Sequence, residues 1–305
     1  MRYDKPPLTF QEQADLLLSR GMKGDRSAIM DRLAVVNYYR LSGYWHPFRC
    51  PGDDTFRPNT TFETVWQRYA FDRHLRLLVM DAVERIEVAV RTQLAYHLAH
   101  QSGDPFAYAI DPAVLPGLSF DQRQRLLEDL TGETVHSKET FVEHFRNKYG
   151  DQHAFMPIWM AAEVMTFGCV LTLFRGVHPD IRKQLAVRFG VHDTVLASWL
   201  LTLNTVRNIC AHHGRLWNRE FGVQPKIPRK IEAWNMPVPV AGQRMFTILT
   251  VCKHCLDQIA PQSHWPARWR ELLASYPYIP RGSMGFPAHW EACPIWAESK
   301  ETDND

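Results

Sequence analysis

The residues best suited to chemistry lie in one segment, residues 207–219. These thirteen residues read Arg-Asn-Ile-Cys-Ala-His-His-Gly-Arg-Leu-Trp-Asn-Arg and hold three arginines, two adjacent histidines and two asparagines. An arginine guanidinium is a planar, permanently charged donor that matches phosphate oxygens. A histidine imidazole has the ordinary pKa nearest neutrality, so it accepts and releases protons at cellular pH. The composition therefore indicates a site that holds a phosphate while a proton is transferred.

The spacing within this segment leaves two readings open. On a helix, Asn208 and His212 are four residues apart and share a face, whereas Arg207 and His212 lie about 140° apart around the axis. Arg207 and His212 meet only if the arginine reaches round, the helix end is distorted, or a second chain supplies the partner. The structural alternative is that Arg207 pairs with a core carboxylate and that His212 is a hydrogen-bonded core histidine.

Helical signals dominate the chain that must position this segment. Thr9-Phe-Gln-Glu12 and Ser119-Phe-Asp-Gln122 have the spacing of capping boxes and predict two helix starts, the first helix ending near Gly21. Thr60-Thr-Phe-Glu63 predicts the start of a long helix that runs to about His100. Apolar periodicity predicts further helices over roughly residues 27–39, 139–149, 157–175 (with Pro157 in its first turn), 179–189, 193–213 (with Gly214 as its stop), 242–259 and 266–275.

The fold expected from these signals is all-α, because no run of alternating strands and no internal repeat is found. Residues 1–60 are predicted to form an N-terminal helical extension packed on the core, in which residues 41–48 make an aromatic turn. Residues 61–222 are predicted to be the helical core. Residues 223–305 are predicted to be a linker with four prolines over residues 225–242, C-terminal helices and an irregular strap, with residues 301–305 frayed.

Composition excludes several classes of protein. With 305 residues, 45% of them hydrophobic, and a net charge of +2, the chain is typical of a globular protein without a global field for nucleic acid. Six cysteines are scattered and the N-terminus lacks an apolar leader, which favours a cytoplasmic protein with reduced thiols and no membrane segment. Cys252-Lys-His-Cys255 has no second ligand pair, so we expect core cysteines and neither a metal site nor a cofactor.

Four segments, in order, resemble one family. Arg207-Asn208-x-x-x-His212 resembles the signature of the HEPN ribonuclease superfamily, an arginine and a polar residue followed by a histidine. The longer string over residues 207–219 resembles abortive-infection proteins of the AbiD/AbiF type. Residues 37–48, 71–92 and 157–168 are similar to three further blocks of that family, and the resemblance covers roughly residues 7–230.

The resemblance implies a HEPN-like helical bundle that acts as a metal-independent endoribonuclease. In such enzymes the 2′-hydroxyl of RNA attacks the adjacent phosphorus and leaves a 2′,3′-cyclic phosphate. By motif, His212 would be the general base or acid, Arg207 would stabilise the charged phosphorane, and Asn208 would orient the phosphate or the imidazole. The family usually pairs two motifs across one cleft, which implies a homodimer here, since the chain has one motif. His213 departs from the minimal motif, and which of the two histidines faces the cleft is left open.

The remaining candidates are supporting and RNA-binding residues. Glu87 with Arg91 continues a series of helical pairs, after Asp72 with Arg76 and Asp81 with Arg85, in which the acid precedes the arginine by four residues. Glu163 lies among apolar residues and is expected to be buried and to pair with Arg91 or Arg207. Residues 201–230 hold six basic residues against Glu220 alone, and this local excess gives the candidate RNA contacts Arg215, Asn218, Arg219, Lys226 and Lys230.

The expected function is therefore a growth-arresting toxin in bacterial anti-phage defence that cleaves RNA. One alternative is a non-catalytic RNA-binding protein of the same fold that holds a structured small RNA, such as an antitoxin RNA encoded nearby. A third is a helical protein that only binds a protein partner. Co-purified RNA that stays intact would favour the second, and the third predicts that Arg207→Ala changes neither toxicity nor RNA binding.

Overall fold

The computed structural model describes residue 2 and residues 6–297, and the predicted fraying of residues 301–305 lies outside them. In this part of the chain the regular elements are α-helices and short 3-10 helices, and extended pairing is limited to isolated bridges such as that of Arg49 with Phe56. The predicted all-α fold is thus confirmed. The chain forms two compact units, one up to Leu77 together with Arg270–Pro280, the other Leu78–Trp269 together with the chain from Arg281.

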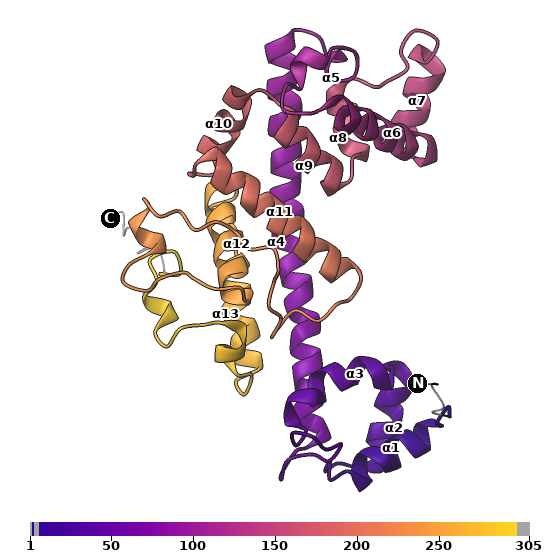
Figure 1. Ribbon diagram of the computed structural model, residues 1–305, viewed down its shortest axis with the longest axis vertical. Helices are drawn as coiled ribbons and strands as arrows, with labels where there is room; N and C mark the ends of the chain where they lie inside the picture. Colours follow the sequence, from indigo (N-terminus) through magenta and orange to yellow (C-terminus); the bar gives the residue numbers. More distant parts are fainter. Residues whose placement is uncertain (1, 3–5, 298–305) are drawn as a thin grey trace. The chain divides into compact units, whose positions relative to one another are not determined.

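The first unit contains α1 (Phe10–Ser19), α2 (Arg26–Val35), α3 (Tyr38–Trp45), η1 (His46–Phe48) and the beginning of α4 (Phe62–Ser102), as labelled in Figure 1. The capping box at the start of α1 is confirmed: the Thr9 hydroxyl accepts from the Glu12 amide at 3.2 Å, and the Glu12 carboxylate accepts from the Thr9 amide at 2.8 Å. Gly21 follows α1 with φ +92°, a left-handed conformation suited to glycine.

Three predictions for this unit are wrong in detail. The single helix expected over residues 27–39 is two helices, because the Asn37 side chain accepts from the Tyr39 amide at 2.7 Å and starts α3. Residues 41–48 are helical rather than a turn. The capping residue before α4 is Thr61, whose hydroxyl accepts from the Thr64 amide at 3.1 Å, whereas the hydroxyl of Thr60 donates to a carbonyl of the preceding loop.

A buried polar cluster connects α3 to α4. Both the hydroxyl of Tyr44 and the guanidinium of Arg76 donate to Asp72 at 2.6 Å, and all three side chains are buried. The predicted pair of Asp72 with Arg76 is therefore confirmed, and Tyr44 supplies a second donor to the carboxylate. Because a buried carboxylate needs hydrogen-bond partners, this cluster fixes how α3 lies on α4.

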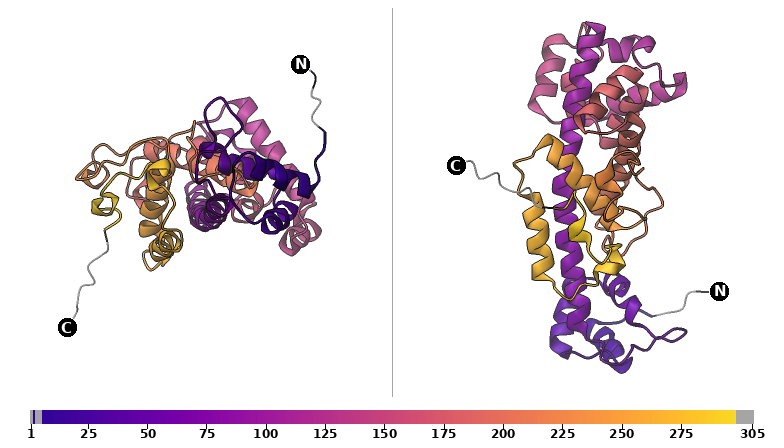
Figure 2. Two further views of the ribbon diagram at one scale, coloured as in Figure 1. Left: turned by 90° about the horizontal axis from the view of Figure 1, so that it is seen from below. Right: turned by 90° about the vertical axis from the view of Figure 1, so that its left-hand side faces the viewer.

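The second unit contains the rest of α4 and the helices that carry the motif. Its elements are α5 (Ala107–Ile110), η2 (Pro112–Val114), α6 (Phe120–His136), α7 (Thr140–Tyr149), α8 (Ile158–Val164), α9 (Phe167–Gly176), α10 (Pro179–Arg188), α11 (Asp193–Ala211), η3 (Glu232–Trp234), α12 (Met245–Ile259), the beginning of α13 (Trp265–Ser275), η4 (Arg281–Met284) and η5 (Trp290–Ala292). Figures 1 and 2 show α9 and α10 beside α11, the helix that ends at the arginine–histidine segment. The predicted capping box at Ser119 is confirmed at the start of α6.

The helix predicted over residues 157–175 is broken into α8 and α9. Met165 is extended, and the Thr166 hydroxyl accepts from the Cys169 amide at 3.3 Å, which starts a new helix. Pro157 precedes α8 as its N-cap rather than lying in its first turn. This break turns the chain between the two helices, and α9 then packs on α11.

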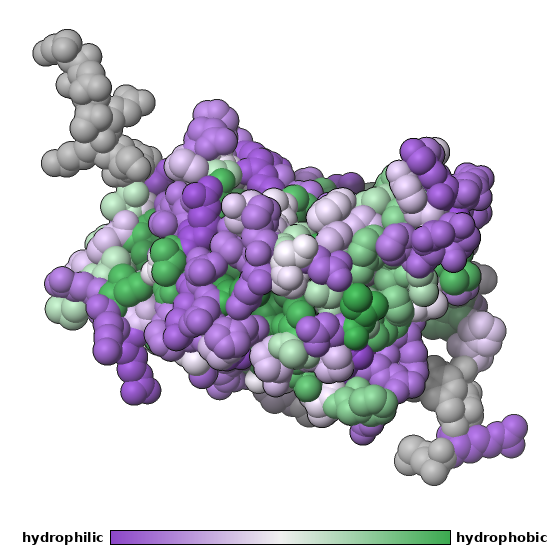
Figure 3. Space-filling model, turned by 90° about the horizontal axis from the view of Figure 1, so that it is seen from above, coloured by the Kyte–Doolittle hydropathy of each residue, from purple (hydrophilic) through white to green (hydrophobic). Residues whose placement is uncertain are grey.

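Buried cysteines and tryptophans fill the core of the second unit. Cys252 and Cys255 are fully buried in α12, as expected of core cysteines, and burial raises the pKa of both thiols. On the face shown in Figure 3, hydrophilic side chains are interspersed with apolar ones. None of the helices in the described part of the chain combines the length and apolar character needed to cross a bilayer.

Candidate functional site

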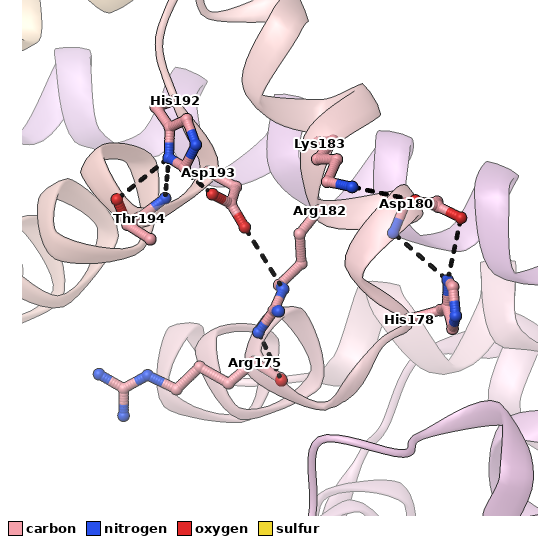
Figure 4. Close-up of polar contacts among 8 residues, drawn as sticks. All are labelled: Arg175, His178, Asp180, Arg182, Lys183, His192, Asp193 and Thr194. Carbon is pink, nitrogen blue, oxygen red and sulfur yellow. Dashed lines mark hydrogen bonds and ion pairs between the residues drawn. The ribbon is translucent and has the colours of Figure 1, made fainter.

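Helix α11 carries the arginine–histidine segment at its end, and its start contacts α10. The Asp193 carboxylate lies 3.8 Å from Nε of Arg182, and Nη1 of Arg182 donates to the carbonyl of Arg175 at 3.5 Å. Figure 4 shows how Arg182 thereby links the end of α9, its own helix α10 and the first turn of α11. The Nδ1 atom of His192 accepts from the Thr194 amide and caps the helix. These contacts connect the start of α11 to α9 and α10.

The end of α11 is a Schellman motif. His212 is the last residue of near-helical conformation, and His213 takes the left-handed conformation with φ +56°. The amide of His213 donates to the carbonyl of Cys210 at 2.9 Å, and that of Gly214 donates to the carbonyl of Ile209 at 2.7 Å, the two bonds that define the motif. The predicted stop at Gly214 is therefore one residue late: the left-handed residue is His213.

Gly214 has a different role from that of a left-handed cap. A β-carbon at this position would lie 2.9 Å from Cγ2 of Ile209 and 3.1 Å from the carbonyl oxygen of the same residue. Only glycine lets the chain approach the last turn of α11 so closely. His213 and the arginines that follow are consequently held against the helix end.

The same motif ends two other helices of this chain, and there glycine takes the left-handed position. Gly21 follows α1 with φ +92°, and Gly190 follows α10 with φ +65°, each with the same pair of backbone hydrogen bonds. A left-handed conformation costs a residue with a β-carbon roughly 1–2 kcal/mol, although histidine tolerates it better than most. His213 therefore stands where this chain otherwise uses glycine.

The side chains of Arg207 and His212 make few contacts that would stabilise the fold. Arg207 is half-buried, its Nη1 atom lies 3.5 Å from Oδ1 of Asn208, and it forms no ion pair with any described residue. The imidazole of His212 is exposed and makes no hydrogen bond within the described chain. The structural alternative, an arginine paired with a core carboxylate and a buried histidine, is therefore wrong for both residues.

The geometry of α11 separates Arg207 from His212. The helix is regular through Ala211, so the two positions remain about 140° apart around the axis. Their side chains make no hydrogen bond to each other, whereas Asn208 and His212 are four residues apart on one exposed face. One chain therefore presents the amide of Asn208 and the imidazole of His212 on one face, and the guanidinium of Arg207 reaches that amide from the neighbouring face.

A second polar cluster joins α4 to the end of α8. Nη1 of Arg91 donates to the carbonyls of Ala162 at 2.7 Å and Glu163 at 3.2 Å, and Nη2 donates to the carboxylate of Glu87. Glu87 is buried and Arg91 nearly so, which confirms their predicted ion pair. Arg91 thus supplies donors to the last carbonyls of a short helix, which otherwise lack partners.

The prediction for Glu163 is wrong. Its side chain is exposed, and the contact with Arg91 is made by its backbone carbonyl rather than by its carboxylate. In α8 the buried positions are those of Ile158, Ala161 and Ala162, so Glu163 lies on the outer face of the helix. Among the described residues, Arg207 makes no hydrogen bond or ion pair with Glu87, Arg91 or Glu163.

The candidate RNA-binding residues fall into two groups. Arg215, Asn218 and Arg219 follow the end of α11, where Nε of Arg219 donates to the carbonyl of Arg215 at 2.9 Å. Oδ1 of Asn218 is buried and accepts no hydrogen bond from the described chain. Lys226 and Lys230 are exposed and lie apart, since the backbone of Lys226 is bonded to the first half of α11.

Glu220 offsets less of the positive charge of residues 201–230 than the sequence suggests. Glu220 is the one acid among residues 201–230, and its carboxylate accepts from Arg244 just before α12. Sequence reasoning missed this pairing because the two residues are far apart in the chain. The carboxylate of Glu220 is therefore shared with a cation from outside residues 201–230, which leaves the local excess of positive charge larger than the count along the sequence.

A family model described as Abi-like protein matches residues 31–218, well over half of the chain. The chain belongs to the Abi-like protein family. No curated protein and no solved structure showed significant similarity. Membership of this family associates the chain with abortive infection, a form of phage defence. Arg207, Asn208, His212 and the Schellman motif lie inside the matched region, whereas Arg219, Lys226 and Lys230 lie beyond its end.

Proposed function

We propose that this Abi-like protein is a metal-independent endoribonuclease of the HEPN type that arrests growth during phage infection. The observation that carries the proposal is that Arg207 and His212 have no structural task among the described residues. A half-buried guanidinium without a carboxylate partner is ready to bind an anion, and an exposed imidazole is ready to transfer a proton. Buried or half-buried cations are usually paired, so this arrangement favours an external anionic ligand.

The chemistry that these groups support is transesterification of RNA. A base removes the proton of the 2′-hydroxyl, the O2′–P bond forms, and the P–O5′ bond breaks as the leaving oxygen is protonated. Arg207 would stabilise the extra negative charge on the phosphorane, and His212 would carry one of the two proton transfers. Asn208, on the same face as His212, would donate to a phosphate oxygen or orient the imidazole. The products are a 2′,3′-cyclic phosphate and a 5′-hydroxyl.

The separation of Arg207 and His212 favours a site made by two copies of the chain. In a two-fold dimer each motif meets the other, so that a guanidinium from one copy can reach the phosphate held near an imidazole of the other. A dimer of this kind needs no distortion of α11, which agrees with the regular helix observed up to Ala211.

The test is cleavage of RNA by the purified protein with a chelator present. Replacing His212 or Arg207 by alanine is expected to lower the rate by about 10²–10⁴-fold, because one group for proton transfer or charge stabilisation is lost. Fragments are examined for cyclic phosphate ends, and thermal unfolding confirms that each variant folds. His136→Ala, which removes an exposed histidine from α6, serves as the matched control. Equal cleavage by His212→Ala and wild-type protein would refute the site.

A second candidate function is supported by the excess of basic residues over residues 201–230. With Glu220 engaged by Arg244, residues such as Arg215 and Arg219 would hold a structured small RNA without cleaving it. In that case RNA co-purifies intact and remains intact in the cleavage assay. Its affinity then falls steeply with salt, as expected when phosphate contacts dominate.

A further inference from the structure

A stripe of polar residues runs along the accessible face of α11 toward His212. Ser198, Thr205 and His212 are spaced by seven residues, so each lies two turns from the next with only about 20° of drift. Ser198 and Thr205 are half-buried, and His212 with the neighbouring Asn208 is exposed. From Ser198 to His212 the helix rises about 21 Å, at about 1.5 Å per residue.

A basic segment, residues 225–230, is fixed to the far end of this stripe. The amide of Lys226 donates to Oγ of Ser198 at 2.8 Å, and its carbonyl accepts from Nε1 of Trp199 at 2.8 Å. We call residues 225–230 the basic strap. Because Trp199 is fully buried, its indole can hold the strap in one place.

The other end of the basic strap is also held. The side-chain amide of Asn235 donates to the carbonyls of Pro228 at 3.2 Å and Ile231 at 2.9 Å. The ring of Trp234 packs on that of Trp199, with 5.1 Å between their centroids. The strap backbone is therefore ordered in advance of any ligand, which lowers the entropic cost of binding one.

The side chains of the basic strap are free to meet a ligand. Lys226, Arg229 and Lys230 are exposed, and none forms an ion pair with a described acidic residue. A surface loop whose cations served only solubility would not need its backbone bonded to Ser198, Trp199 and Asn235. Three cations on a fixed backbone, at the start of a polar stripe that ends at His212, fit the backbone of an extended anion.

We propose that single-stranded RNA lies along the stripe, with the reacting phosphate at His212 and more distant phosphates on the basic strap. This proposal rests on the proposed role of His212. A span of 21 Å corresponds to roughly six nucleotides at about 3.4 Å per stacked nucleotide, and to fewer in an extended strand. The exposed amide of Asn208 suits contact with a sugar–phosphate backbone, whereas the hydroxyls of Ser198 and Thr205 donate to carbonyls of α11 and add only small polar surface along the stripe. The proposal predicts that long strands bind better than short ones.

The experiment measures RNA binding by fluorescence anisotropy in the His212→Ala background, so that the RNA stays intact. Labelled single strands of about four and about twelve nucleotides are compared, a range that covers single-strand site sizes. Replacing Lys226, Arg229 and Lys230 by alanine is expected to weaken binding of the long strand at least about tenfold. It is also expected to reduce the salt dependence by about two counterions, at about 0.7 per phosphate contact. Binding of the short strand is expected to stay the same.

Two further variants make the result specific. Replacing Lys138, Lys148 and Arg188, three exposed cations elsewhere in the same unit, is expected to leave both affinities unchanged. Thr205→Glu places a negative charge in the middle of the stripe and is expected to weaken the long strand by repulsion. Thermal unfolding verifies that each variant folds.

The outcomes separate this proposal from the proposed function. If the strap variant binds both strands as tightly as its parent, the path along α11 is wrong whatever the cleavage assay shows. The path is also wrong if the variant loses affinity for both strands by the same factor. If the strap substitutions weaken binding of an RNA duplex of the same length as much as they weaken binding of the single strand, the assignment to single strands is wrong. If wild-type protein fails to cleave RNA while the length-dependent loss is observed, the proposed function fails and the binding path stands.

Discussion

At the scale of single residues, His213 is the most informative position of the site. The chain uses glycine in the two Schellman motifs after α1 and α10 but histidine in the one that ends α11. A residue with a β-carbon keeps a strained backbone conformation where its side chain is needed, and such residues cluster at functional sites. Because His212 is near-helical and His213 is left-handed, the two imidazoles leave the backbone in different directions. Two such groups would suit a reaction that needs both a base and an acid.

His213→Gly tests this interpretation without breaking the motif. Glycine removes the left-handed strain, so the free energy of unfolding is expected to stay the same or rise by up to about 1 kcal/mol. If His213 takes part in proton transfer, RNA cleavage falls by about 10²-fold or more in the same protein. Chemical unfolding and the initial rate of cleavage are measured side by side.

The control for His213→Gly lies in the same unit. Gly190→Ala adds a β-carbon to the left-handed residue after α10, where the nearest atoms are 3.5 Å or more away, and measures what the conformation costs in this chain. That variant is expected to lose about 1 kcal/mol of stability and no activity. A His213→Gly protein with full cleavage would show that His213 is only a tolerated cap.

At the scale of elements, the pair of Glu87 and Arg91 holds the end of α8 against α4. Arg91→Met removes the donors to the carbonyls of Ala162 and Glu163 and leaves the Glu87 carboxylate buried without a cation. Removing one partner of a buried ion pair costs about 3–5 kcal/mol, so a fall of about 3 kcal/mol in the free energy of unfolding is expected. Urea unfolding measures it. Glu87→Gln in the Arg91→Met background is expected to restore part of the loss, because the unpaired charge is then gone.

The same variants distinguish support from participation in the site. If Arg91 acts only through the end of α8, Arg91→Met and the double variant lower cleavage in step with their loss of folded protein. A loss of cleavage by the fully folded double variant as large as that of Arg207→Ala would place Arg91 in contact with RNA. Arg91 donates to the carboxylate of Glu87 in α4 and to the carbonyl of Ala162 in α8, which favours a role in supporting the end of α8.

The elements also show which structural features a sequence predicts. Helix starts with their own local signal, such as Thr9 before α1 and Ser119 before α6, were predicted because the cap and its partner lie three residues apart. The breaks at Asn37 and Thr166 were not, since a capping side chain inside a continuous apolar pattern looks like an ordinary helical residue. The prediction that Glu163 is buried was wrong for the same reason, because the break after α8 decides which face of the helix Glu163 occupies.

Within the site, residue types indicated the chemistry but could not supply its surroundings. Arginine and histidine at the end of a predicted helix pointed to phosphate handling and proton transfer. That Arg207 has no carboxylate partner among the described residues, and that Glu220 accepts from Arg244, depends on contacts between distant segments. The basic strap is a further example: Lys226 meets Ser198 across 28 residues of sequence. The spacing of seven between Ser198, Thr205 and His212 was the one local signal of the stripe.

At the scale of the whole molecule, the question is how many chains make one site. Arg207 and His212 stand on different faces of a regular helix, and the proposed reaction needs both groups at one phosphorus. If each site combined Arg207 of one copy with His212 of the other, a dimer would hold two such sites related by its two-fold axis. The alternative, in which each chain carries a complete site, requires the Arg207 side chain, which approaches Asn208, to serve the same phosphorus as His212 of its own chain.

Mixing two inactive variants separates these arrangements. In a dimer of one Arg207→Ala chain with one His212→Ala chain, shared sites place both substitutions in one site and leave the other site intact. Equal amounts that exchange subunits freely give half mixed dimers, so cleavage is expected to recover to about one quarter of the wild-type rate. Sites confined to one chain predict no recovery, because every chain then lacks one of the two groups. A double Arg207→Ala/His212→Ala protein mixed with either single variant is the control and should stay inactive, since no dimer that it forms contains an intact site.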